Sequence, residues 1–208
     1  MNAVRSLATE LRTSTMKEHK ITEGASFIKN LFQGECSEKE YTQYLWALRE
    51  LYKTLEDLLT EYQSQPNIAL VFFPELFRQP SLSQDLKIWG AETEIPKTVK
   101  QAAENYANHL KTLGKSNPAL LVAHAYVRYL GDLSGGQMMG RVLQRQYPNR
   151  DGFNFYKFDI PDAEQMKNLY RSRLDQVGEL SPGLIDNLCA EAQLAFRLNE
   201  DIFKSLSS

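Results

Sequence analysis

One stretch of the sequence, residues 119–143, combines a helical pattern with several glycines, which helices ordinarily avoid. It reads ALLVAHAYVRYLGDLSGGQMMGRVL. Apolar residues recur at helical spacing in its first half, and Asn117-Pro118 supplies an N-cap followed by a proline at the first helical position. The second half contains four glycines, Gly131, Gly135, Gly136 and Gly140. Each glycine costs about 1 kcal/mol relative to alanine in a helix interior. The stretch therefore predicts a helix whose bare half serves a purpose that offsets this cost.

Two interpretations of the bare half follow from spacing. A helix face without side chains can bend, and its backbone can approach a flat ligand closely. Arg128 and Asp132 are four residues apart, as are Asp132 and Gly136, so the carboxylate lies on the bare face with a guanidinium one turn before it. The alternative is a close crossing of two helices through small residues, with Arg128 and Asp132 as a solvated surface pair. Spacing alone leaves both open.

Three sequence motifs resemble those of heme oxygenases, in the order that this family has them. RYLGDLSGGQ within the glycine-rich stretch resembles the distal helix of the family. LRTSTMKEHKITEGASFIKNLFQG, residues 11–34, is similar to its proximal helix. KNLYRSR, residues 167–173, is similar to the segment that holds the heme propionates. The resemblance covers almost the whole chain.

The proximal motif contains the candidate iron ligand. Apolar residues between Val4 and about Glu18 share one helical face, His19 lies near the end of this pattern, and Glu23 follows one turn later. At this spacing a carboxylate can orient an imidazole and raise its basicity. A histidine on a helix is also commonly just exposed or hydrogen-bonded. The resemblance implies that His19 is the axial ligand of heme iron and that Glu23 lies beside it.

The distal site is expected to gather residues from several helices. Apolar positions between 41 and 62 predict a long amphipathic core helix that contains Tyr52, for which core packing with an incidental hydrogen bond is the alternative role. The resemblance implies that Asp132 holds a distal water, in a network that differs in detail from many animal members because Val127 replaces a hydroxyl residue. The implied catalytic residues are Asp132, Gly131, Arg128, Tyr52 and Asn199.

A second set of residues is expected to bind heme itself. Lys167 and Arg171 are four residues apart, which lets both cations reach one carboxylate, although an ordinary solvated face has the same spacing. The resemblance implies that these cations hold the propionates and so fix which carbon of the ring is attacked. The implied heme-binding residues are Arg12, Glu23, Tyr126, Gly135, Gly136, Lys167, Arg171 and Phe196.

The sequence around the other two histidines, and around one predicted helix start, gives further expectations. His109 falls on the polar side of a helix that Pro96 opens and Gly114 ends, where it is expected to be solvated. His124 lies among apolar residues and is expected to be a hydrogen-bonded core histidine. Ser81-x-x-Gln84 resembles a capping box at the start of a helix.

Composition limits the remaining classes of function. The 208 residues suggest one domain, 1–208, and a net charge of −2 with no strongly basic region argues against a nucleic-acid partner. Two cysteines without CxxC spacing indicate reduced thiols and a cytoplasmic location. The apolar runs are short and polar-flanked and there is no signal-peptide core, so neither export nor a membrane anchor is expected.

These observations predict a single all-α domain of about eight helices, with heme between the His19 helix and a kinked glycine-rich helix. The resemblance implies oxidative cleavage of heme to biliverdin, in the IXα isomer, with carbon monoxide and ferrous iron. The reaction would use O₂ and electrons from a soluble donor, either ferredoxin or an NADPH-dependent reductase. Three alternatives remain: a heme carrier that needs His19 but not Asp132, a thiaminase-like hydrolase, and a structural helical domain that leaves the glycine cluster unexplained.

Overall fold

The computed structural model describes residues 5–90 and 94–206, and the regular secondary structure of these residues is entirely helical. Its α-helices are α1 (Leu7–Ser14), α2 (Met16–Glu23), α3 (Ser26–Gln33), α4 (Glu38–Glu61), α5 (Pro66–Ala69), α6 (Gln79–Trp89), α7 (Lys97–Ser116), α8 (Leu121–Gly131), α9 (Gln137–Gln146), α10 (Ala163–Leu180) and α11 (Ile185–Leu206). Single 3₁₀ turns are η1 (Pro74–Leu76), η2 (Pro118–Leu120), η4 (Asn154–Tyr156) and η5 (Pro182–Leu184), and η3 (Asp132–Gly136) is a π-helix. The all-α prediction is confirmed.

The α-helices outnumber the eight expected because segments expected to be continuous are divided. The first division is at Thr15, whose hydroxyl donates to the Leu11 carbonyl at 2.7 Å and whose backbone leaves helical geometry. Such a local side-chain bond competes with helix continuation. The break places His19 in the middle of α2, whereas Val4 lies outside the described residues.

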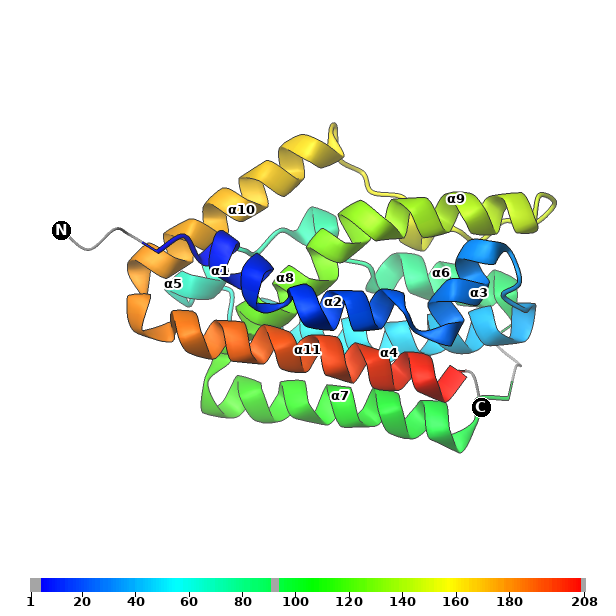
Figure 1. Ribbon diagram of the computed structural model, residues 1–208, viewed down its shortest axis with the longest axis horizontal. Helices are drawn as coiled ribbons and strands as arrows, with labels where there is room; N and C mark the ends of the chain where they lie inside the picture. Colours follow the sequence, from blue (N-terminus) through cyan, green and yellow to red (C-terminus); the bar gives the residue numbers. More distant parts are fainter. Residues whose placement is uncertain (1–4, 91–93, 207–208) are drawn as a thin grey trace.

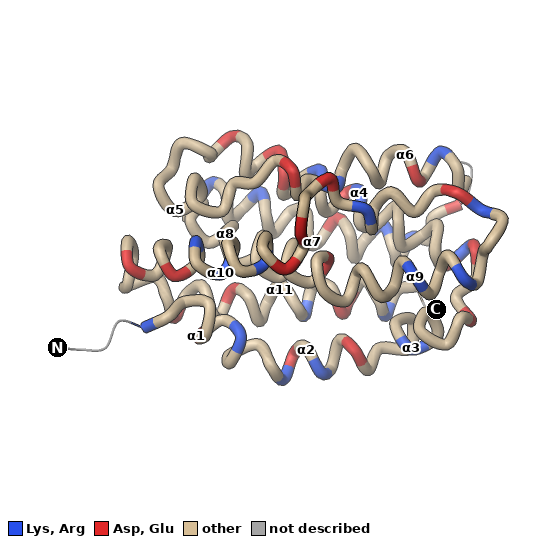
Figure 2. Tube along the Cα trace, turned by 90° about the horizontal axis from the view of Figure 1, so that it is seen from above, with Lys and Arg blue, Asp and Glu red and all other residues tan. Residues whose placement is uncertain are grey.

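The long helices α4, α7 and α11 run side by side along the long axis of the molecule (Figure 1). Helix α11 also packs against α1, α2 and α8, so it contacts both the first helices of the chain and the central one. Lys and Arg residues are interspersed with Asp and Glu residues along most of the helices (Figure 2). No helix of the described part of the chain combines the length and apolarity that a bilayer crossing needs.

Helix α4 supplies much of the core, as its apolar pattern predicts. A capping box formed by Ser37 and Glu40 starts it, and a full stripe of its residues is buried. One buried residue is charged: Glu56 accepts the backbone N–H groups of Arg78 and Gln79 at 2.5 and 3.1 Å. Burial raises the pKa of this carboxyl to about 7.

The Glu56 carboxylate explains why the capping box expected at Ser81 is wrong. Helix α6 begins two residues earlier, at Gln79, with Pro80 in its first turn. The N–H groups at that end bond to Glu56 from another helix, so no local side-chain cap is needed. The start of α6 is therefore set by tertiary packing.

The central glycine-rich stretch bends through the π-helix η3 between α8 and α9 (Figure 1). Its glycines serve two different purposes. A Cβ on Gly140 would lie 2.8 Å from Cβ of Tyr156, so this glycine allows close packing against η4. A Cβ on Gly131 or Gly135 would meet no atom within 4 Å. These two glycines therefore leave an open face where packing does not require one.

The two kinds of glycine predict opposite effects on stability. Gly140→Ala should lower the free energy of unfolding by about 1–2 kcal/mol, because the clash with Tyr156 exceeds the gain in helix propensity. Gly135→Ala should leave stability unchanged or raise it by up to about 1 kcal/mol. Urea denaturation of both variants, followed by circular dichroism, measures the difference. A Gly140→Ala variant as stable as Gly135→Ala would contradict the packing role.

Candidate functional site

A buried cluster of polar side chains lies beside the bend between α8 and α9. Arg128 donates from Nε to the Tyr52 hydroxyl at 2.9 Å and from Nη1 to Oδ1 of Asn199 at 2.8 Å. Its Nη2 lies 3.2 Å from Oδ1 of Asp132, and the Tyr52 hydroxyl donates to the other Asp132 oxygen. Tyr52 comes from α4, Asn199 from α11, and Arg128 and Asp132 from the central stretch. The structure thus brings four of the five predicted catalytic residues into direct contact.

Burial excludes the interpretation of Arg128 and Asp132 as a solvated surface pair. Their exposed fractions are only 8% and 6%. Burial raises the pKa of Asp132 above its ordinary value, while the charge of Arg128 and the bond from Tyr52 act in the opposite direction. The position of the Asp132 carboxyl is fixed by Arg128 on one oxygen and Tyr52 on the other.

The predicted iron ligand has very different surroundings. His19 and Glu23 lie on α2, which has no buried residue, and their side chains are 58% and 65% exposed. Nδ1 of His19 is 3.4 Å from Oε1 of Glu23. In the described part of the chain no hydrogen bond reaches Nε2, so this nitrogen is available to a metal ion. The predicted pairing of His19 with Glu23 is confirmed as geometry.

Helix α11 connects the His19 side to the buried cluster. The Phe196 ring lies edge-on to the His19 imidazole, with centroids 5.8 Å apart. Asn199 bonds to Arg128 only three residues further on. Residues three apart share one face of a helix. One face of α11 therefore holds the imidazole of α2 and the guanidinium of α8 in a fixed relation.

The open face of the bent stretch is exposed as well as bare. Gly131, Ser134, Gly135 and Met138 are all exposed there, at spacings that place them on one side. Gly136 differs, because it is buried and a Cβ on it would lie 3.6 Å from Cβ of Asp132. Gly131 and Gly135 are thus on the open face, and a heme contact by Gly136 stays a prediction.

The cations expected to bind propionates already share a carboxylate. Nζ of Lys167 lies 2.6 Å from Oε2 of Glu164, and Nη1 of Arg171 lies 3.8 Å from its Oε1. The Lys167 side chain is mostly buried, whereas that of Glu164 is 64% exposed. Both cations thus lie near one carboxylate, that of Glu164, which was not anticipated from the sequence, and their contact with propionates stays a prediction. The position of Glu164 three residues before Lys167 was the available signal.

Tyr126 lies close enough to two of the other basic residues to feel their charge. Burial raises the pKa of its phenol, while a hydrogen bond to Thr15 and the charges of Arg171 and Arg12 lower it. Arg12 is exposed at the end of α1. The structure therefore groups Arg12, Tyr126 and Arg171, which come from three different helices.

These features fit heme as the ligand. An imidazole with one nitrogen available is a normal axial ligand of heme iron. Bare backbone at Gly131 and Gly135 gives room for a flat ring, and basic side chains pair with carboxylates such as propionates. The donor set contains no feature that conflicts with this ligand.

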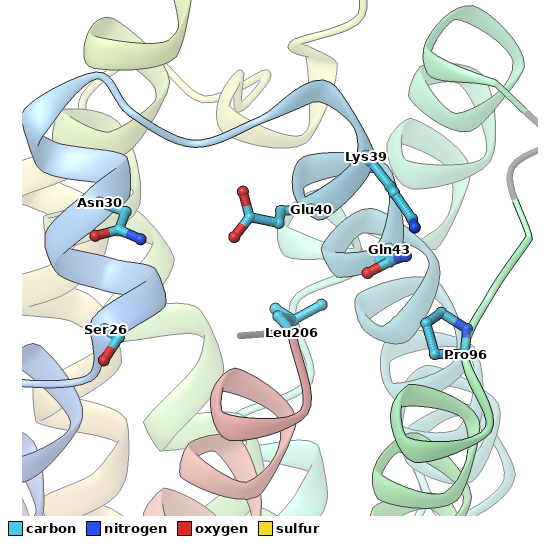
Figure 3. Close-up of a pocket in the computed structure, with 7 residues that line it drawn as sticks. All are labelled: Ser26, Asn30, Lys39, Glu40, Gln43, Pro96 and Leu206. Carbon is cyan, nitrogen blue, oxygen red and sulfur yellow. The ribbon is translucent and has the colours of Figure 1, made fainter. Parts of the chain in front are cut away.

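A separate cavity of about 440 Å³ lies between α3, the start of α4 and the end of α11 (Figure 3). It contains none of the predicted site residues. Its lining is mostly polar: Ser26, Asn30, Lys39, Glu40, Gln43, Pro96 and Leu206. A ring as large and apolar as heme needs an apolar pocket. This cavity is therefore not the candidate heme site.

The other two histidines occupy a second polar cluster. His124 is buried and hydrogen-bonded, as predicted, with Nδ1 2.9 Å from the Tyr106 hydroxyl. The expectation that His109 is solvated is wrong, because its Nε2 lies 2.6 Å from Oε1 of Glu191. Glu191 is 82 residues away from His109, so no local pattern could have indicated the contact.

Comparison with known proteins gives a consistent result. A family model described as "Heme oxygenase" matches residues 5–205. A heme oxygenase of Porphyra purpurea is 38% identical over 209 residues, which cover 99% of this chain and 88% of that protein. Heme oxygenase 1 of Homo sapiens is 35% identical, over 96% of this chain and 71% of that protein.

Solved structures agree. The crystal structure of heme oxygenase-1 from Synechocystis sp. PCC6803 in complex with heme superposes with a TM-score of 0.88 at 32% identity, over 97% of this chain and 92% of that one. Heme oxygenase from Leptospira interrogans gives a TM-score of 0.87 at 34% identity, over 96% and 98% of the two chains. The match of the family model to nearly every residue, together with these relatives, shows that the chain belongs to the heme oxygenase family.

Proposed function

We propose that this protein binds heme at His19 and cleaves it oxidatively to biliverdin, carbon monoxide and ferrous iron. The observation that carries the proposal is the buried contact of Asp132 with Arg128 and Tyr52, directly beside the open face of Gly131 and Gly135. When bound, heme supplies the iron that activates O₂ and is itself the substrate. The protein's own residues determine where that oxygen reacts.

His19 would hold the heme iron, and Glu23 would orient its imidazole. A carboxylate at Nδ1 favours the tautomer in which Nδ1 carries the proton and Nε2 faces the metal. Phe196 packs against the edge of the ring and limits its rotation.

Asp132 would act through water beside the open face of Gly131 and Gly135. Its carboxyl is held by Arg128 and Tyr52, and Asn199 holds Arg128 in turn, so its position is fixed before substrate arrives. A carboxyl held in one position could bind a water and relay a proton through it. The missing side chains at Gly131 and Gly135 would let a flat ring lie close to the backbone beside this carboxyl.

The competing functions lack support from this site. A heme carrier would need His19, but it would not need the buried side chains that hold the Asp132 carboxyl in position. A thiaminase-like hydrolase would need an activated nucleophile such as a thiolate. Burial raises the pKa of Cys36 to about 12 and also raises that of Cys189, which makes both thiols unreactive.

The co-substrate, the electron donor and the location belong to the same proposal. Cleavage of the ring consumes O₂ and electrons, for which a ferredoxin or an NADPH-dependent reductase is the proposed source. Two free thiols support a reducing, cytoplasmic compartment.

The first prediction tests the iron ligand. His19→Ala should still take up heme through the basic residues and the open face of Gly131 and Gly135, but should lose the spectrum of imidazole-ligated iron and most biliverdin formation. Absorption spectra with and without added imidazole measure this, since imidazole should partly restore the ligand. His109→Ala is the matched control and should keep the wild-type heme spectrum. If the two variants behaved in the opposite way, the ligand would be His109.

The second prediction concerns the propionates. Replacing Lys167 and Arg171 together by Ala should weaken heme binding and yield a mixture of biliverdin isomers, because the cations fix the rotation of the ring. Chromatography of the products shows the isomers. Arg173→Ala, on the same helix but bonded to Gln176, should still give the IXα isomer alone. A single isomer from the double variant would show that contacts other than these two cations orient the ring.

The third prediction separates a catalytic role of Asp132 from a structural one. Asp132→Asn keeps the size of the side chain but removes the carboxyl, and should lower the rate of biliverdin formation by about 10²–10⁴. Peroxidase-like oxidation of guaiacol should rise at the same time, because oxygen that is not directed at the ring oxidises other compounds. Asp132→Ala should also lower the free energy of unfolding by about 3 kcal/mol, because it leaves a buried cation without its partner.

Three measurements on these variants decide the role of Asp132: melting temperature, biliverdin yield and guaiacol oxidation. A lowered melting temperature with biliverdin formed at the wild-type rate would show that Asp132 only stabilises the bend. Tyr52→Phe provides a control, since it removes one bond to the carboxyl but retains the carboxyl itself.

A further inference from the structure

A second cluster of ionisable side chains lies outside the heme site, where α7, α8 and α11 meet. His109 of α7 and His124 of α8 both direct Nε2 at Oε1 of Glu191, at 2.6 and 2.8 Å. The three atoms lie within 4.8 Å of one another. None of these residues has a role in the function proposed above.

The chemistry of this cluster is that of a transition-metal site. Two imidazole nitrogens and one carboxylate form a common ligand set of Zn²⁺, with water in the open position. Ligand atoms of a tetrahedral Zn²⁺ ion are about 3.3 Å apart, given bond lengths of about 2.0–2.2 Å. The two nitrogen–oxygen distances of the cluster need to open by less than about 1 Å to reach this separation. Side-chain rotation can supply a movement of that size.

The cluster is also accessible from one side. The His124 side chain is fully buried, that of Glu191 is 11% exposed, and that of His109 is 29% exposed. An ion can therefore enter beside His109 and retain water there.

Tyr106 supplies the outer contact that metal-binding histidines usually have. Its hydroxyl lies 2.9 Å from Nδ1 of His124, on the opposite edge of the ring from Glu191. When Nε2 binds a metal, Nδ1 carries the proton and donates it to an acceptor such as this hydroxyl. Tyr106 also has a side-chain hydrogen bond with Asn199. The cluster is thus one residue away from the distal network.

We propose that His109, His124 and Glu191 form a binding site for a divalent transition-metal ion of the Zn²⁺ type, separate from heme iron. The bound ion joins α7, α8 and α11 at one point. It also makes His124 Nδ1 the donor to the Tyr106 hydroxyl. The alternative is that the two imidazoles only share a carboxylate, in which case the cluster has no affinity for metal.

The test is a titration of the chelator-treated, heme-free protein with Co²⁺, which replaces Zn²⁺ and has visible absorption bands that report its ligands. The chain has three histidines, and the variants replace one inside the cluster, His109, and the one outside it, His19. One Co²⁺ ion should bind per chain. His109→Ala and Glu191→Gln should each weaken binding by at least about tenfold, and Tyr106→Phe by about 10–100-fold. His19→Ala should bind Co²⁺ as the wild type does.

Thermal unfolding gives an independent readout that does not involve heme. Saturating Zn²⁺ should raise the melting temperature of the wild type and of His19→Ala, but not that of His109→Ala, since an ion that binds only the folded state stabilises it. Because His109 is the most exposed of the three residues, its replacement by Ala is not expected to prevent folding. No bound Co²⁺ at millimolar concentration, or equal affinity in the wild type and His109→Ala, would overturn the proposal.

Discussion

The buried guanidinium of Arg128 is the interaction on which the arrangement of the site depends. A cation that is 8% exposed must be paired and hydrogen-bonded, because an unpaired buried charge costs several kcal/mol. Its partners Tyr52 and Asn199 are 76 and 71 residues away along the chain, and Asp132 lies one turn further on. The charge is therefore satisfied only when α4, α8 and α11 are packed together. The condition for a stable core is thus the same as the condition for an oriented Asp132.

The bend after Arg128 gives this network access to the ligand. A regular helix would continue past Asp132 with the same spacing, whereas the π-helix η3 changes the direction of the chain at the carboxyl itself. Gly140 then allows α9 to pack closely on Tyr156, which holds the bend. The glycines, although unfavourable in a helix, therefore have two roles. Gly131 and Gly135 leave an open face, and Gly140 allows a close contact.

Local spacing predicted the parts of the site that depend on one helix. The pairs His19 with Glu23, Arg128 with Asp132, and Lys167 with Arg171 all follow from a separation of four residues. Spacing could not predict burial. It therefore could not decide whether Arg128 and Asp132 form a solvated surface pair or part of a ligand site. It also could not predict contacts between distant segments. The Glu56 carboxylate at the start of α6 and the Glu191 carboxylate between two histidines both replaced a local expectation with a tertiary contact.

The two sides of the proposed heme site differ in burial: the polar contacts of Asp132 are buried, whereas Lys167 and Arg171 pair with an exposed carboxylate. This difference fits a ligand that enters as heme and leaves as biliverdin. On the distal side, Asp132 is buried and its partners are permanent. On the propionate side, Lys167 and Arg171 hold the carboxylate of Glu164, which is largely exposed. The neighbouring cations hold the pKa of Glu164 below its ordinary value, so the carboxylate stays charged. An exposed ion pair is weak, because water and salt screen both charges. In the proposed heme complex a propionate would replace Glu164 as the partner of these cations, so the mostly buried Lys167 would keep a counter-ion.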